Sequence, residues 1–348
     1  MKTWFTLLLI LYAPWGAAQI NVSESIRLSG FATFSAAKSD TKTPIINNRE
    51  VNDDWCFDCD TAVGLQLDAD FTDHWRASAQ LVKRPQDTFS SPELEQAFIE
   101  YANRDVQVKI GRLRVPLYML SEVYYVSSAY PWLRLPISVY SFDLGLTHFD
   151  GGRLDWNVEL SDNVQLVLSP FVTSSSDNTQ SLYGFDSQFE TKASAGISSQ
   201  VFYNDHEFKM SYLRSDVTIT SPIVNNGKTN SVIDLATFGV SYYLDDLHFQ
   251  SEVLFSNDFD ADWYAGFDYT LGDWIPYIQY GQQRNNVNNE SYLIGTRFNI
   301  TRQINLNLEW QYIEGREEAV NGYFTQIQLA PPIESTAQLY SIGLSFTF

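Results

Sequence analysis

The sequence predicts an all-β fold, a transmembrane antiparallel β-barrel with sixteen strands as the expected number. Three observations favour this fold. Segments with apolar residues at every second position recur along the chain, as in strands with one apolar and one polar face. Short polar turns alternate with longer loops, and after a leader-like start no stretch of 18 residues is free of charge. We therefore expect no membrane-spanning helix.

The first 18 residues are typical of an export signal. Lys2 supplies a positive charge, an apolar run follows from Trp4 to Tyr12, and small residues at 16–18 precede a cut before Gln19. The apolar run is too short to span a membrane as a helix. We expect residues 1–18 to be a cleaved signal peptide and residues 19–348 to form one barrel domain.

Two kinds of connection alternate along the expected barrel. Seven short turns fall at 72–74, 103–105, 161–163, 204–206, 244–246, 271–273 and 299–303. Eight longer loops, rich in Asn, Ser, Asp and Gly, fall near 38–60, 85–92, 115–150, 174–185, 218–230, 257–261, 284–289 and 314–334. These connections imply sixteen strands, with both chain ends on the side of the short turns. A barrel of that size leaves a water-filled passage, whereas one of eight strands is filled by side chains.

Several strand segments show a period of two. In 62–71, 292–300 and 304–312, apolar residues for a lipid-facing side alternate with polar or small residues for the lumen. The segment 106–114 changes step, because apolar residues up to Ile110 are followed by Arg112 and Arg114 at the positions of the same face. A β-bulge at Gly111 is the expected reason, and it would turn both arginines into the lumen.

The last strand ends the chain on an aromatic residue. Its apolar positions are Tyr340, Ile342, Leu344, Phe346 and Phe348, and small or polar residues lie between them. A terminal strand of this kind, ending in Phe, resembles the signal of Gram-negative outer-membrane barrels. The resemblance implies recognition by the barrel-assembly machinery. We expect this strand to pair with the first one, near 26–34, so that the barrel has no open edge.

The amino-acid composition indicates which classes of partner the protein can have. The net charge of −20 argues against nucleic acid, which needs a basic surface. Aromatic residues make up 15% of the chain beside few charged ones, which suits a lipid-facing exterior around a polar lumen. A soluble β-sandwich is the alternative, but such a fold rarely carries so many large aromatic side chains.

Catalysis is not expected from the histidines. His74, His206 and His248 fall at or beside short turns, and His148 lies in a long loop two residues before Asp150. No serine has the strand–turn–helix context of a nucleophile elbow, and no cluster of ligands suggests zinc. We therefore expect no enzyme, no metal and no cofactor.

The two cysteines, Cys56 and Cys59, lie three residues apart in an acidic loop. In an exported protein such a pair predicts a small disulfide. Metal binding would need further ligands, and no histidine lies nearby. The neighbouring aspartates are those of a solvated loop, although they are also of a type that holds a divalent cation.

The third long loop is unusually apolar and aromatic for a surface segment. Its stretches Gly-Arg-Leu-Arg-Val-Pro-Leu-Tyr (111–118) and Tyr-Pro-Trp-Leu-Arg-Leu-Pro (130–136) resemble those of uncharacterised proteobacterial porin-like proteins. The resemblance to the Gram-negative outer-membrane porin superfamily implies that the third extracellular loop folds inward and narrows the channel. The chain lacks the acidic Pro-Glu-Phe-Gly-type tip of the best-known trimeric porins.

Charges and aromatics of this region are the candidate pore residues. Opposed charges across a constriction orient polar solutes, and arginine binds carboxylates and phosphates well. The candidates for constriction and solute contact are Arg112, Arg114, Arg134, Glu100, Glu122, Tyr118, Tyr124 and Tyr125. The alternative is that the arginines pair with Glu122, Asp143 or Asp150 and only fix the loop, while the aromatics pack against the wall.

The sequence thus predicts an outer-membrane channel for passive diffusion of small hydrophilic solutes or ions. The alternative is a structural or adhesive barrel with an occluded lumen. Expected partners are membrane lipid, lipopolysaccharide and the assembly machinery, with a homotrimer as a further possibility.

Overall fold

The computed structural model describes residues 19–85, 90–140, 147–182, 185–222, 227–256, 259–284, 288–319 and 323–348, so the expected leader lies outside it. Within these residues the helical segments are short: η2 Ser121–Val123, η3 Ser127–Ala129 and α1 Ile137–Tyr140. The strands are β1 Ile20–Ser23, β2 Ile26–Ser39, β3 Ala62–Asp70, β4 Trp75–Lys83, β5 Glu93–Ala102, β6 Val106–Arg114, β7 His148–Ser161, β8 Val164–Thr173, β9 Ser176–Leu182, β10 Phe185–Thr191, β11 Ser194–Tyr203, β12 His206–Thr220, β13 Lys228–Leu244, β14 Leu247–Ser256, β15 Phe259–Tyr269, β16 Trp274–Gln283, β17 Asn289–Asn299, β18 Ile304–Glu314 and β19 Thr336–Thr347. No described helix is long and apolar enough to cross a membrane.

Sixteen strands close into an antiparallel barrel, as predicted. The ring runs from β2 to β8 and continues from β11 to β19. The last strand closes it, because β19 pairs with β2 from Thr347↔Phe31 to Leu339↔Ser39. Phe348 and Gly30 exchange two further backbone hydrogen bonds. The prediction that the terminal strand pairs with the first strand is confirmed.

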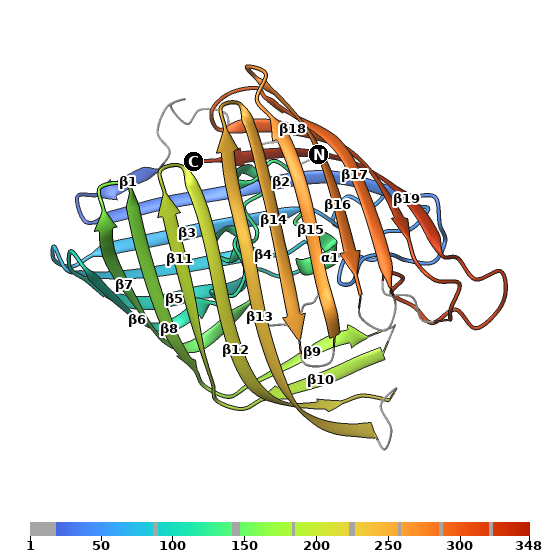
Figure 1. Ribbon diagram of the computed structural model, residues 1–348, viewed down its shortest axis with the longest axis horizontal. Helices are drawn as coiled ribbons and strands as arrows, with labels where there is room; N and C mark the ends of the chain where they lie inside the picture. Colours follow the sequence, from blue (N-terminus) through green and yellow to red (C-terminus); the bar gives the residue numbers. More distant parts are fainter. Residues whose placement is uncertain are drawn as a thin grey trace, which may run out of the picture.

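The barrel has a turn end and a loop end. The seven predicted short turns all join neighbouring strands at the turn end. One long loop was wrongly assigned as irregular, since the chain near 174–185 forms the hairpin β9–β10 (Figure 1). The sequence of this hairpin has no alternation of apolar residues from which strands could be predicted. It forms because β12 extends beyond the end of β11 and pairs there with β10, from Val217↔Thr191 to Thr220↔Gln188.

The two faces of the wall follow the predicted alternation. On β19, Tyr340, Ile342 and Leu344 are exposed on the outside, while Ser341 and Ser345 are buried inside. The outer surface is therefore apolar and the lumen wall polar.

The bulge predicted at Gly111 is absent. The register of β5 and β6 runs unbroken from Ala102↔Gln107 to Ala97↔Arg112, and that of β6 and β7 is also continuous. Ile110 points outward with 66% of its surface exposed, so Arg112, two residues later, lies on the same outer face. The register shift occurs instead where β5 meets β4, beside Gln80.

A second layer lies inside the barrel. The chain after β6, residues 115–140, enters the lumen and is called here the inward loop. Figure 1 shows its α1 turn within the ring, behind β15 and β16, and α1 contacts both strands. Apolar loop residues such as Leu117 and Trp132 are buried against inward-facing residues such as Leu235 and Tyr264. The prediction of an inward-folded third loop is confirmed.

Candidate functional site

Lumen-facing side chains hold the inward loop by its backbone. Lys209 Nζ donates to the carbonyl of Tyr118 at 2.6 Å, and Thr237 Oγ1 donates to that of Leu117 at 2.7 Å. Asn307 Nδ2 donates to the carbonyl of Pro131 at 2.8 Å. These donors come from β12, β13 and β18, so the loop is fastened across a large part of the wall.

Arg297 on β17 is the most heavily used donor. Its guanidinium donates to the carbonyls of Ser127 at 2.6 Å and Ser128 at 3.1 Å, and also to that of Tyr130. Buried carbonyls without partners are costly, and one side chain here satisfies a whole bend of the loop.

Two wall carboxylates accept the loop's N–H groups. Glu252 on β14 accepts from the backbone N–H of Met119 at 2.9 Å and from the hydroxyl of Tyr140 at 2.7 Å. Glu309 on β18 accepts from the backbone N–H of Leu133 at 2.7 Å. These contacts fasten the loop to two further strands of the wall, β14 and β18.

Glycines make room for the loop on the wall. A Cβ at Gly239 would clash with Met119, and one at Gly343 would clash with Leu133. Both glycines face the lumen, where a larger residue would push the loop away from the wall. They are therefore packing positions of the inner layer.

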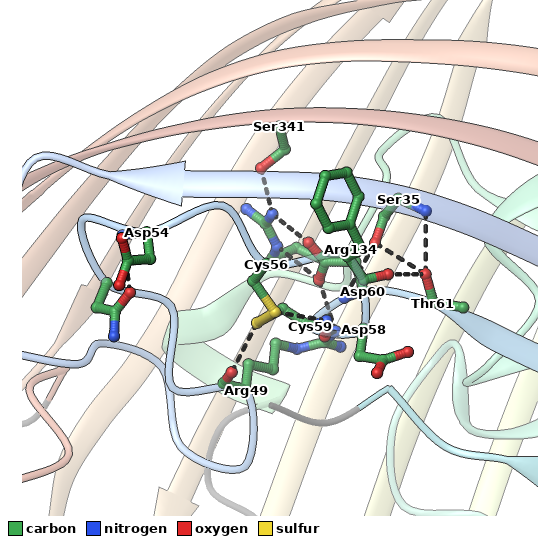
Figure 2. The surroundings of a disulfide bond; sticks show 12 residues. Ser35, Arg49, Asp54, Cys56, Asp58, Cys59, Asp60, Thr61, Arg134 and Ser341 are labelled. Carbon is green, nitrogen blue, oxygen red and sulfur yellow. Dashed lines mark hydrogen bonds and ion pairs between the residues drawn. A yellow bond between two sulfur atoms is a disulfide. The ribbon is translucent and has the colours of Figure 1, made fainter. Parts of the chain in front are cut away.

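Arg134 ties the inward loop to the first long loop (Figure 2). Its guanidinium donates to both carboxylate oxygens of Asp60, at 3.1 and 2.6 Å, and also to Gln311 and Ser341. Arg134 and Asp60 are both buried. Burial alone would raise the pKa of Asp60, but Arg134 and Arg49 overcome it and hold that pKa below its usual value. Arg134 thus makes a contact that holds the loop, but its partner Asp60 was not among the carboxylates expected from the sequence.

Cys56 and Cys59 form a disulfide immediately before Asp60. Figure 2 shows the bond beside the Arg134–Asp60 pair. Cys56 also pairs with Ala37 of β2 through two backbone hydrogen bonds of 2.8 Å. The disulfide thus closes the short segment that presents Asp60 to the inward loop.

Arg114 is buried where β6 ends and the inward loop begins. Its Nη1 lies 2.8 Å from Glu95 Oε2, its Nη2 donates to Gln80, and its guanidinium lies 4.7 Å from the ring centre of Tyr125. Tyr125, another candidate, is buried there. This ion pair and stacking hold the start of the loop.

Arg112 lies outside the lumen, contrary to expectation. It forms a two-pronged ion pair with Asp150, with both nitrogen–oxygen distances at 2.9 Å, on the outer face. The pairing with Asp150 is the alternative weighed from the sequence. Asp143, another carboxylate weighed there, lies outside the described residues.

Glu100 and Glu122 belong to a charged stripe on the lumen side of β4 to β7. Glu100 lies 2.9 Å from Arg76 and 3.6 Å from Lys109, so its partners are residues of the neighbouring strands and not the candidate arginines. Glu122, on the inward loop, lies 2.6 Å from Arg153. We define the charged stripe as Arg76, Glu100, Lys109, Glu122, Arg153 and Asp155.

Sequence reasoning missed four of these six residues. Arg76, Lys109, Arg153 and Asp155 lie within strands, outside the aromatic loop that the sequence marks as unusual. The period of two within β4, β6 and β7 was the available signal, since it places such residues on the polar face.

Tyr118 and Tyr124 pack on Tyr140, with ring centres 4.9 and 6.1 Å apart. Both are partly buried. Tyr124 also donates to the carbonyl of Tyr140 at 3.3 Å. They keep the two halves of the inward loop together.

Replacing Arg76 by Ala is expected to shift the reversal potential in a salt gradient toward cations, with the permeability ratio changing roughly twofold. The side chain of Arg76 is 37% exposed on the lumen side, and its loss leaves the charge of Glu100 less balanced. Arg112→Ala is the matched control and should leave the potential unchanged, because Arg112 lies on the outer face. Equal shifts for both variants would contradict this assignment.

The described residues include no group of three or more His, Cys, Asp or Glu side chains placed to share a metal ion. Comparison with sequence-family models finds no match, and comparison with curated proteins finds none either.

Comparison with solved structures identifies the fold. The chain is similar to an anion-selective porin from Comamonas acidovorans, with a TM-score of 0.60 and 11% identity over 93% of this chain and 99% of that one. It is similar to OmpF of Salmonella typhi, solved with daunomycin, with a TM-score of 0.60 and 11% identity over 95% and 100%. The outer-membrane channel DcaP of Acinetobacter baumannii gives 0.59 and 12% over 93% and 97%. The chain therefore has the fold of Gram-negative outer-membrane porins.

Proposed function

We propose that this protein is an outer-membrane porin, a water-filled channel for passive diffusion of small hydrophilic solutes or ions. One observation carries the proposal. The inward loop covers the lumen face of β12 to β19, where side chains such as Gln311 and Asn307 are buried, but it leaves charges on the other side in contact with water. Glu122 is 50% exposed and Arg76 is 37% exposed, although both face the inside of the barrel. Solvated charge inside the barrel supports a passage.

The charged stripe bears on selectivity. The acidic and basic side chains of the stripe alternate and pair with one another. Their electrostatic fields therefore largely cancel at a distance, while the field close to the stripe stays strong. We expect weak ion selectivity and orientation of dipolar solutes as they pass.

The fold supports a setting in the outer membrane. The apolar outer face contacts membrane lipid and lipopolysaccharide, and the turn end lies in the periplasm. Residues 1–18 act as a cleaved export signal, and the assembly machinery recognises the terminal strand ending at Phe348. The channel acts as a monomer or as a homotrimer.

Planar-bilayer recording tests the channel. The protein folded in detergent is expected to give discrete conductance steps in concentrated KCl, because water and ions enter along the charged stripe. Heat-denatured protein at the same concentration is the control. An absence of steps from folded protein would favour the alternative, a structural or adhesive barrel with an occluded lumen.

A further inference from the structure

Three side chains near the turn end are hydrogen-bonded in a row. The hydroxyl of Ser241 lies 2.8 Å from Nε2 of His248, and Nδ1 of the same ring lies 2.7 Å from Oδ2 of Asp268. An ionised carboxylate only accepts hydrogen bonds, so in the neutral imidazole Nδ1 carries the proton and Nε2 accepts from the serine hydroxyl. This is the order of contacts in a serine nucleophile, a general base and an orienting carboxylate.

The register of three successive strands creates this order. His248 on β14 pairs directly with Asp268 on β15. Ser241 on β13 pairs with Gln250, which is one position further along the lumen face from His248. Because alternate residues share a face, Ser241, His248, Gln250 and Asp268 all point inward. His248 stood out beside a short turn, but its two partners lie on neighbouring strands, so the grouping appears only once the register is known.

The surroundings fix the imidazole and leave the serine residue partly exposed. His248 is buried, and the ring of Tyr243 stacks on it with centres 4.2 Å apart and planes 11° apart. Ser241 is partly exposed, beside the short turn that joins β13 to β14. A base held in one orientation next to an accessible nucleophile is the arrangement that acyl transfer needs.

We propose that Ser241, His248 and Asp268 form the catalytic triad of an esterase at the turn end of the lumen. Ser241 Oγ bonds to the acyl carbon of a carboxylic ester while its proton passes to His248 Nε2. The bond to the alcohol oxygen then breaks, and the alcohol leaves with that proton. Water repeats the sequence on the acyl-serine, which releases the carboxylic acid and restores the hydroxyl. Asp268 is a positioning residue that holds the ring.

Gln250 is placed to stabilise the negative oxygen of the intermediate. Directly opposed side chains on antiparallel strands have Cβ atoms about 5 Å apart, so the amide of Gln250 reaches a group bonded to Ser241. Its Nε2 donates to the hydroxyl of Tyr264 at 3.0 Å, and an amide nitrogen has two N–H donors. The second N–H serves the oxyanion.

Glu207 sets the class of ester. It pairs directly with Ser241 from the other side, on β12, and is partly exposed. A carboxylate next to the nucleophile repels anionic substrates and attracts cationic ones. The expected substrates are small neutral or cationic esters, able to enter the mouth of the lumen.

A fluorophosphonate probe tests the nucleophile. The serine oxygen displaces fluoride from phosphorus, its proton goes to His248, and the adduct is stable enough for mass spectrometry. We expect a single adduct on the peptide that contains Ser241 and its loss in His248→Gln, which keeps the serine. His74→Gln, at a turn on the far side of the ring, is the control and should label normally. A folded protein without an adduct at Ser241, or equal labelling of His248→Gln, would overturn the proposal.

Ester hydrolysis tests turnover. With p-nitrophenyl acetate, Ser241→Ala is expected to lower the rate above the buffer blank about 100-fold or more. Ser345→Ala, which removes another lumen hydroxyl, should keep the full rate, because this hydroxyl lies 2.9 Å from that of Thr33 on strands far from the site. Acetylthiocholine should react faster than an ester of succinate. A rate unchanged by Ser241→Ala, or no rate above the blank, contradicts the proposal. The bilayer conductance of Ser241→Ala should be unaltered. A failure of the esterase proposal can therefore be told apart from a failure of the channel proposal.

Discussion

Replacing Arg134 by Met is expected to lower the free energy of unfolding by about 3 kcal/mol. The substitution leaves the buried carboxylate of Asp60 without its two-pronged partner and also removes the bonds to Gln311 and Ser341. Breaking one side of a buried ion pair costs much more than losing an exposed one, because the remaining charge stays desolvated. Denaturant unfolding in detergent micelles, followed by tryptophan fluorescence, measures the change.

Two further variants make the result specific. Asp60→Asn combined with Arg134→Met should cost less than the sum of the single changes, since the two side chains contact each other. Arg112→Met removes an exposed ion pair and should cost less than about 1 kcal/mol. Additive effects of Asp60→Asn and Arg134→Met would contradict the assignment of a coupled buried pair.

The same pair predicts the response to acid. Burial acts to raise the pKa of Asp60, but Arg134 and Arg49 hold it below its usual value. A lowered folded-state pKa means that the stabilisation is complete above the unfolded value, about 3.9, and is lost as pH falls through the folded value. The stability difference between the unaltered protein and Arg134→Met should therefore be constant at neutral pH and shrink in acid, where Asp60 of the variant is protonated first because Arg49 alone opposes the effect of burial on its pKa.

Replacing Arg297 by Ala is expected to release the middle of the inward loop and to make the open channel noisy. Four loop carbonyls, that of Trp132 included, lose their common donor, and each buried carbonyl left unpaired costs about 1–3 kcal/mol. Water entering the gap would loosen the bend at Ser127–Tyr130. We expect frequent transitions among several conductance levels in single-channel records.

Arg302→Ala is the matched control for Arg297→Ala. Arg302 lies in the short turn after β17, so the variant removes the same charge and leaves the loop's hydrogen bonds intact. Its records should match those of the unaltered protein. Quiet, single-level openings of Arg297→Ala would mean that the loop is held well enough by its other bonds.

The strand pattern made most of the barrel predictable. Alternation at Tyr340 to Phe348 and the short turns are local features, so the strand order and the closure onto β2 followed from the sequence. The hairpin β9–β10 did not follow, because its pairing depends on the length to which β12 extends. Whether a strand extends into a long loop depends on contacts between residues that are distant in sequence. A local sequence pattern does not predict such contacts.

The site was harder to predict than the fold. The side to which Arg112 points depends on the register, and an assumed bulge at Gly111 reversed it. Arg134 was placed in the right region, but its partner Asp60 lies far away in sequence and only the folded structure brings them together. Ser241, His248 and Asp268 likewise come from three strands. To predict which side chains meet across strands, the strand register must be known. To predict that a segment forms a strand, it need not be known.

The position of the inward loop depends partly on hydrogen bonds to its backbone, which do not depend on the side chains of the loop. Lys209, Thr237 and Arg297 bind carbonyl groups, which every residue of the loop possesses whatever its side chain. Substitutions at solvated loop positions such as Glu122 can therefore accumulate without displacing the loop. Under the proposed channel function, such substitutions would change which solutes pass while the scaffold stays the same. The same property makes these positions suitable for directed evolution.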